Sequence, residues 1–278
     1  MIYHDLKYYQ PETMEEAIRA WNEAQTEGLK PRYLSGGTEV VTLARDGKQT
    51  PGALIDLKRI PETHGISAVD GSVRYGSSIP LTTLSDEPER SRFPLLAHAA
   101  GAVADRTIRN SITLGGNIAG MLPYREAVLP FILFEAIFEF VTSDGSDGVS
   151  VNRVAAAEAF KSRLLVPEGG FLSAVLIPAA ALDAPWAYRR RTRDARVDYP
   201  LVTVCGGRVG DTVRLAVSGA FNGPVTGTVA DGRTLEDRLV ATLESFTMKY
   251  RNDMRGSAEY RRSLLTLLAT EIVEEMES

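Results

Sequence analysis

The sequence predicts an α+β protein of two or three lobes. Its 278 residues, 44% hydrophobic and 24% charged, are enough to bury more than one core. Two glycine pairs, Gly36–Gly37 and Gly115–Gly116, each follow an apolar segment in the N-terminal half. Beyond Pro178 several strand-like segments come first and helix-like segments follow, which is typical of a small antiparallel sheet backed by helices.

The N-terminal part mixes helices and strands. Thr13 and Glu16 have the spacing of a capping box, which predicts a helix of about 14 residues that ends near Gly28. Strands are expected at three apolar or alternating segments, the first two in one sheet: 53–57, 73–77 and 137–142. Further helices are expected at 81–84, 93–104 and 129–136.

The C-terminal part begins after an alanine- and proline-rich stretch at 179–185, where we expect a lobe boundary. Three strands are expected to follow, at 186–191, 202–208 and 213–219. Helices are then expected at 235–243 and 257–275.

The first glycine pair lies between an apolar strand and a short helix at 39–45. Without a Cβ, glycines let backbone N–H groups come close to a ligand and permit positive φ. The N–H groups that begin the helix would then point at whatever the loop binds.

The second glycine pair lies in the segment 105–130. The basic residues Arg106 and Arg109 and an apolar alternation come first, and Asn117 follows the pair. We expect a short strand, the glycine pair and a second phosphate cradle, although such a pair is often an ordinary turn. Two cradles would suit a ligand with two phosphates.

Charge and cysteine content restrict the compartment and the partners. The net charge of -5, without a long basic run, argues against nucleic acid as a partner. The single cysteine, Cys205, excludes an intrachain disulfide and fits a reducing, cytoplasmic compartment; we expect it to be a core residue in a strand. The three histidines lack ligand spacing, so we expect no metal site.

No membrane span or export signal is expected. The longest apolar run, 127–137, is interrupted by Pro130 and Glu135 and is too short to cross a bilayer. The N-terminus lacks a charged segment followed by an apolar one.

Four stretches resemble the FAD-binding medium subunit of the molybdenum hydroxylases, the xanthine dehydrogenase and carbon monoxide dehydrogenase type. They are Leu34-Ser35-Gly36-Gly37-Thr38-Glu39, Leu54-Ile55-Asp56-Leu57, Ile108-Arg109-Asn110 through Thr113-Leu114-Gly115-Gly116-Asn117-Ile118, and Ser257-Ala258-Glu259-Tyr260-Arg261-Arg262. The resemblance implies a two-subdomain FAD-binding fold of the vanillyl-alcohol-oxidase type at 1–178, with subdomains about 1–56 and 57–178. A C-terminal domain with a small antiparallel sheet and helices would follow at 179–278.

The resemblance also implies where FAD is bound. Its pyrophosphate would be held by the N–H groups of residues 35–39 and 113–117, without a covalent link because neither loop contains histidine or cysteine. The implied FAD-binding residues are Arg32, Tyr33, Leu34, Ser35, Gly36, Gly37, Thr38, Glu39, Val103, Ile108, Thr113, Gly115, Gly116, Asn117, Glu126, Leu172, Arg190, Asp198 and Tyr199.

Two of these positions have open alternatives. Glu126 stands where most of the family has an aspartate near the flavin, and the segment 121–125 departs from the family's run of small residues. Tyr199 would lie against the isoalloxazine, or would only pack; the basic residue upstream of it would be Arg189 or Arg190.

The implied function is electron transfer. A large molybdopterin-binding subunit would oxidise the substrate, a small subunit would carry two [2Fe–2S] clusters, and this chain would pass the electrons through FAD to a terminal acceptor. Two alternatives are an FAD-free scaffold subunit and a stand-alone flavin oxidoreductase.

Overall fold

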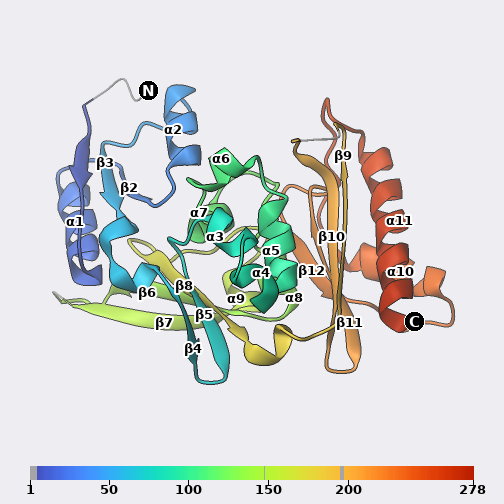
Figure 1. Cartoon of the computed structure of the whole chain (residues 1–278). Helices are drawn as coiled ribbons and strands as arrows, with labels where there is room; N and C mark the ends of the chain where they lie inside the picture. The colour runs from blue at the N-terminus through green and yellow to red at the C-terminus, as the bar shows by residue number, and fades with distance from the viewer. Residues whose placement is uncertain (1–4, 147, 195–196) are drawn as a thin grey trace.

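The structure is a computed structural model that describes residues 5–146, 148–194 and 197–278. These residues form three sheets with the strand orders β1-β3-β2, β4-β5-β8-β6-β7 and β12-β11-β10-β9. Figure 1 shows the lobes in chain order, from the N-terminal sheet and its helix through a central lobe to the C-terminal sheet with α10 and α11. The predicted α+β class is confirmed.

The first lobe is a parallel sheet of β1 (Lys7–Tyr9), β2 (Pro31–Leu34) and β3 (Ala53–Asp56), with α1 (Met14–Thr26) and α2 (Thr38–Arg45). Thr13 caps α1 as predicted, accepting from the Glu16 N–H at 3.2 Å. The Glu16 carboxylate reaches back to the Glu12 N–H at 2.8 Å. All four residues of β3 are buried, because it is the central strand and packs beneath α1.

The second lobe is an antiparallel sheet of β4 (Ile66–Val69), β5 (Ser72–Gly76), β6 (Ile137–Ser143), β7 (Val149–Ala155) and β8 (Phe171–Pro178). The expectation that 73–77 would share a sheet with 53–57 was wrong. β5 pairs with β4 and β8, whereas β3 is already flanked by β1 and β2. β7 and β8 have no counterpart among the predicted strands; β8 is an almost unbroken apolar run, without the alternation that marks a half-buried strand.

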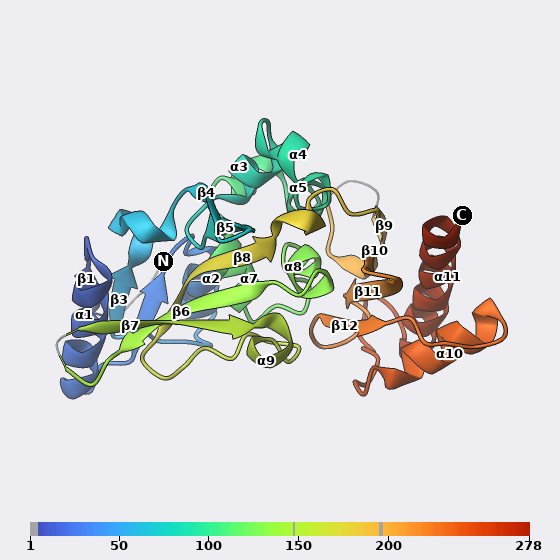
Figure 2. The ribbon, with the colours of Figure 1, turned by 90° about the horizontal axis from the view of Figure 1, so that it is seen from below.

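Short helices cover this sheet: α3 (Leu81–Ser85), α4 (Glu89–Arg92), α5 (Pro94–Gly101), α6 (Arg106–Arg109), α7 (Leu114–Ala119), α8 (Leu129–Leu133) and α9 (Ala156–Ala159). The 3-10 turns η1 (Leu57–Arg59) and η2 (Pro61–Thr63) lead in from β3, and η3 (Ala179–Ala181) follows β8. The predicted helices at 93–104 and 129–136 are present but shorter. Figure 2 shows the sheet from below, with α3, α4 and α5 near the β4–β5 end.

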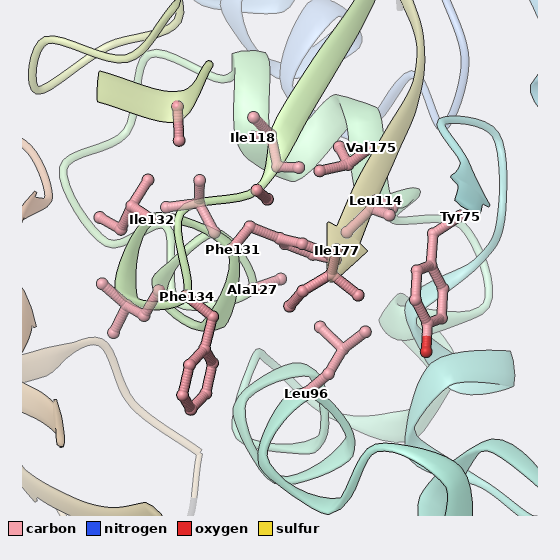
Figure 3. Packing of buried hydrophobic residues seen from close by; sticks show 14 of the residues in the cluster. Tyr75, Leu96, Leu114, Ile118, Ala127, Phe131, Ile132, Phe134, Val175 and Ile177 are labelled. Atoms are coloured by element: carbon pink, nitrogen blue, oxygen red, sulfur yellow. The ribbon is translucent and has the colours of Figure 1, made fainter. Parts of the chain in front are cut away.

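The largest hydrophobic core lies between this sheet and its helices. Figure 3 shows Phe131, Leu96 and Ile177 pointing into one region. The Phe131 ring meets Tyr75 edge to face, with centroids 5.9 Å apart. Cys205 and Ala216 of the C-terminal sheet belong to the same buried cluster, so the second and third lobes share a core.

The third lobe contains β9 (Trp186–Thr192), β10 (Pro200–Val209), β11 (Thr212–Ser218) and β12 (Val225–Thr228), with α10 (Leu235–Ser245) and α11 (Ala258–Glu277). The sheet is antiparallel, and the predicted strands and helices are all present. Cys205 is buried in β10 as expected, and burial raises the pKa of its thiol. No helix of the described ranges has both the length and the apolar content needed to cross a bilayer.

Candidate functional site

The first glycine loop leads into a helix whose backbone donors are open. Gly37 precedes α2 in the left-handed conformation, with φ 76°, and no side chain caps the helix. In the described parts of the chain, the N–H groups of residues 37–40 have no hydrogen-bond partner. Unpaired N–H groups and the positive end of the helix dipole make this N-terminus suited to bind an anion.

Gly36 is required by the neighbouring loop. A Cβ on Gly36 would lie 2.0 Å from the Ser111 carbonyl oxygen and 3.0 Å from the Thr113 nitrogen. Only glycine therefore permits the two loops to touch. The Ser35 hydroxyl, one residue earlier, donates to that of Ser78, just after β5, at 3.1 Å.

The second glycine loop is built differently from the prediction. Residues 106–109 are helical, and the glycine pair lies inside α7 and not after a strand. Gly115 donates its N–H to the Ser77 carbonyl at 2.7 Å, and Gly116 donates to the hydroxyl of the N-cap Thr113 at 3.2 Å. Both N–H groups are thus bonded within the protein. Unlike the first loop, this loop has no row of N–H groups free to bind a ligand, and its backbone can only pack against one.

Two buried polar atoms beside the second loop lack partners. The Asn117 Oδ1 atom and the Ser77 Oγ atom make no hydrogen bond within the described residues. Buried polar groups usually find a partner, because leaving one unpaired costs about 1–3 kcal/mol. A ligand with hydroxyl or N–H groups would satisfy the Asn117 carbonyl.

Glu39 fastens the two loops together. Its carboxylate accepts from the Met121 N–H, just beyond α7, at 2.8 and 3.1 Å. Figures 1 and 2 both show α2 beside α7. The carboxylate therefore holds the shape of the site.

Several predicted residues are packing residues. Tyr33 stacks on Trp21 with centroids 4.7 Å apart and donates its hydroxyl to the Gly169 carbonyl at 2.7 Å; burial raises its pKa. Leu172 is buried in β8, and Leu34 and Val103 are partly buried. Arg32 and Ile108 are exposed, and the partly buried Thr38 is the first residue of α2.

Glu126 is the centre of a buried polar cluster between the second and third lobes. Its Oε1 atom accepts from the Arg190 Nε atom at 2.8 Å, the Thr203 hydroxyl at 2.8 Å and the Tyr188 hydroxyl at 3.0 Å. Burial raises the pKa of Glu126, and Arg190 and the hydroxyl groups oppose that rise. The carboxylate thus binds β9 and β10 to the segment that follows α7.

Arg190 continues this cluster to the predicted Asp198–Tyr199 pair. Its Nη2 atom donates to the Asp198 carbonyl at 2.6 Å, and the Asp198 carboxylate pairs with Arg255. Burial acts to raise the pKa of Asp198, but hydrogen bonds from Arg255 and the backbone outweigh it and the pKa is lowered. Arg189 instead points to Glu271 and Glu275 of α11, so Arg190 is the basic residue of this cluster.

Tyr199 is half-exposed, and its ring stacks on that of Tyr124. Neither Tyr124 nor Arg255 was among the predicted site residues. The signal for Tyr124 was present in the sequence, because it lies in the stretch 121–125 that departs from the family's small residues.

A model of the family described as "FAD binding domain in molybdopterin dehydrogenase" matches residues 4–180. The chain belongs to this family. It is 29% identical over 226 residues to the carbon monoxide dehydrogenase medium chain of Hydrogenophaga pseudoflava, covering 78% of this chain and 76% of that protein. It is 25% identical over 289 residues to the glyceraldehyde dehydrogenase medium chain of Sulfolobus acidocaldarius, covering 98% of each.

A solved structure extends the likeness to nearly the whole chain. Carbon monoxide dehydrogenase from Hydrogenophaga pseudoflava, in the form that lacks the Mo-pyranopterin moiety, superposes with a TM-score of 0.82 and 25% identity over 99% of this chain and 98% of that one. The predicted family and FAD-binding fold are confirmed, with FAD as the cofactor. The predicted role as the flavoprotein subunit of a molybdenum hydroxylase type oxidoreductase is confirmed with them.

The residues present fit FAD. The N–H groups at the N-terminus of α2 suit a diphosphate. The side-chain Oδ1 atom of Asn117, which lacks a partner among the described residues, suits a hydrogen-bond donor group of the cofactor.

Proposed function

We propose that this chain binds the pyrophosphate of FAD at the N-terminus of α2. The observation that carries the proposal is the row of N–H groups at residues 37–40, which begins at the left-handed Gly37 and has no partner among the residues that the structure describes. Bound FAD supplies the chemistry of accepting and releasing electrons, while the protein supplies position and electrostatics. Cofactor binding is non-covalent.

Most of the residues implied by the family resemblance then fall into two groups. Those of the first loop, with Gly116 and Asn117, line the cofactor. A second group packs or is saturated by protein partners and supports that lining: Tyr33, Leu34, Val103, Thr113, Gly115, Glu126, Leu172 and the Glu39 carboxylate. Tyr199, held through Asp198 and Arg190, presents an exposed ring for the isoalloxazine.

We further propose that electrons arrive from the [2Fe–2S] clusters of a small partner subunit in a cytoplasmic complex with a large molybdopterin-binding subunit. Relatives are named as a medium chain or an FAD-subunit, that is, as parts of larger assemblies. The proposed division places the FAD-binding domain at 1–178, with subdomains about 1–56 and 57–178, and the C-terminal domain at 179–278. The order of the three sheets along the chain supports it.

A matched pair of substitutions tests the cofactor site. Gly37 and Gly47 stand at opposite ends of α2 with φ of 76° and 68°, so Gly37→Ala and Gly47→Ala impose similar backbone strain. Each should lower the free energy of unfolding by about 1–2 kcal/mol. Only Gly37→Ala should release FAD, because only that change distorts the N-terminal donors.

The measurements are the flavin absorbance of the purified protein, FAD titration and thermal unfolding. Equal FAD affinity in both variants would contradict the proposed site. A parent that stays colourless after incubation with FAD would favour the scaffold alternative. Turnover of NADH or an organic substrate by the chain alone would favour a stand-alone flavin oxidoreductase.

A further inference from the structure

Two tyrosines and two arginines pack together where the second and third lobes meet. The rings of Tyr124 and Tyr199 are nearly parallel, with centroids 4.7 Å apart and an interplanar angle of 22°. The Arg251 guanidinium carbon lies 4.6 Å from the Tyr124 centroid, and that of Arg255 lies 5.6 Å from the Tyr199 centroid. Both distances are within the range of cation–π attraction.

Asp253 holds the segment that carries both arginines. Its carboxylate pairs with Arg251 at 2.6 Å, accepts from the Arg255 N–H at 2.9 Å and pairs with the fully buried Arg261 at 2.8 Å. Burial acts to raise the pKa of Asp253, but these hydrogen bonds lower it to about 2. Asp253 is therefore ionised at neutral pH. It holds the Arg251 guanidinium and the Arg255 backbone in place, while the Arg255 guanidinium pairs with Asp198.

The residues on either side of Tyr124 in the chain are held by hydrogen bonds. The Met121 N–H is bound by Glu39, and the Pro123 carbonyl accepts from the Ser218 hydroxyl at 3.2 Å. Arg125 donates to the Ile118 carbonyl at 3.4 Å and also to the Ser162 carbonyl. Tyr124 thus stands on an anchored segment, whereas half of the Tyr199 surface is open to solvent.

We propose that Tyr124 is a positioning residue that fixes the orientation of the Tyr199 ring toward the isoalloxazine. The inference rests on the proposed function, which assigns Tyr199 to the flavin. A stacked aromatic pair favours its arrangement by a factor of about 2 to 10 in population. Within the described residues the contacts of the Tyr124 side chain are those of its ring, with Tyr199 and Arg251, and none of its hydroxyl, so the ring carries the role.

The test compares Tyr124→Leu, which removes the ring, with Tyr124→Phe, which keeps it. Tyr260→Leu is the control, because Tyr260 is equally exposed, at 51% against 50% for Tyr199, but lies on α11. The first readout is the near-ultraviolet circular dichroism of the FAD-free protein, which reports the tyrosine stack. The second is the fluorescence of bound FAD, which a neighbouring tyrosine ring quenches.

Tyr124→Leu should weaken the tyrosine circular-dichroism signal and reduce the oriented fraction of Tyr199 by about 2- to 10-fold, so that flavin fluorescence rises. Tyr124→Phe should restore the parent fluorescence, and Tyr124→Leu should add little to Tyr199→Leu. Unchanged fluorescence in Tyr124→Leu, or effects of the two leucine substitutions that simply add, would overturn the inference. A parent that binds no FAD would overturn the proposed function, and this inference with it, before any variant is compared.

Discussion

The two glycine loops share a sequence pattern but use their backbones in opposite ways. In the first, Gly37 takes a left-handed conformation and α2 begins without a side-chain cap, so its N–H groups are open. In the second, Thr113 caps α7 and the N–H groups of Gly115 and Gly116 are already bonded. The first loop can therefore donate hydrogen bonds to a ligand, whereas the glycine pair of the second can only contact a ligand through its van der Waals surface.

The position of the threonine explains part of this difference. Thr113 precedes its glycine pair by two residues, which puts its hydroxyl within reach of the third N–H of the helix. Thr38 follows its glycine pair and is itself the first helical residue, so it cannot cap the N-terminus. The threonine accounts for the bonded Gly116 N–H, whereas the Gly115 N–H is occupied by the Ser77 carbonyl of a neighbouring segment.

The largest predicted effect breaks the contact between the loops. Gly36→Ala places a Cβ 2.0 Å from the Ser111 carbonyl oxygen, a distance that forces the backbone to move. We expect a loss of about 3 kcal/mol in the free energy of unfolding, at the upper end for overpacking, together with loss of FAD. Chemical denaturation and FAD titration measure the two effects.

Gly101→Ala is the control for this change. The added Cβ would lie 3.6 Å from the Ser85 Cβ, an ordinary contact, so stability should change little. The contrary outcome is a Gly36→Ala variant that is as stable as Gly101→Ala and keeps its FAD. It would show that FAD binding does not need the close contact between the two loops.

The sequence predicted elements where local chemistry is strong. The capping box of α1, the strands and helices after Pro178 and the helix after Gly37 are all present. Prediction failed where tertiary contacts decide. β5 joins the second sheet because it pairs with β4 and β8, strands that come from distant parts of the chain or were not predicted. β8 is buried on both faces, so its sequence lacks the alternation of apolar and polar residues that marks a half-buried strand.

The same limit applies to the candidate site: local sequence patterns were informative, and tertiary contacts were not predictable. Glycine spacing and the family resemblance pointed to both loops, but not to which of them keeps free donors. They also could not show that Glu126 is saturated by Tyr188, Arg190 and Thr203, because these partners are 62 to 77 residues away in the chain. The same holds for Tyr124 and Tyr199, which meet only through the packing of two lobes.

A smaller effect is expected from removing the cap that distinguishes the second loop. Thr113→Ala leaves the Gly116 N–H without its acceptor, which should cost about 1 kcal/mol of stability. FAD affinity should change little, because Thr113 is buried and its hydroxyl is committed to α7. Thermal unfolding with and without FAD measures both quantities.

Thr234→Ala provides the comparison, since Thr234 caps α10 with a similar bond, 3.1 Å to the Asp237 N–H, in the third lobe. The two variants should lose similar stability. A fall in FAD affinity of about tenfold, or about 1.4 kcal/mol, in Thr113→Ala alone would show that this hydroxyl serves the cofactor directly.

The smallest effect on stability is expected at Gly116, and it tests whether the second loop touches FAD at all. Gly116 is exposed, and an added Cβ would meet only the Thr113 hydroxyl, at 2.9 Å. Gly116→Ala should therefore alter the free energy of unfolding by no more than about 0.5 kcal/mol.

Gly116→Val should also fold, because the loop is held by Gly36, Gly115 and Glu39 from other directions. If this surface lies against FAD, the larger side chain should leave the protein folded and colourless, while alanine should weaken binding only in part. A valine variant that melts like the parent and keeps its full flavin absorbance would mean that α7 only braces the first loop, and that α2 alone holds the diphosphate.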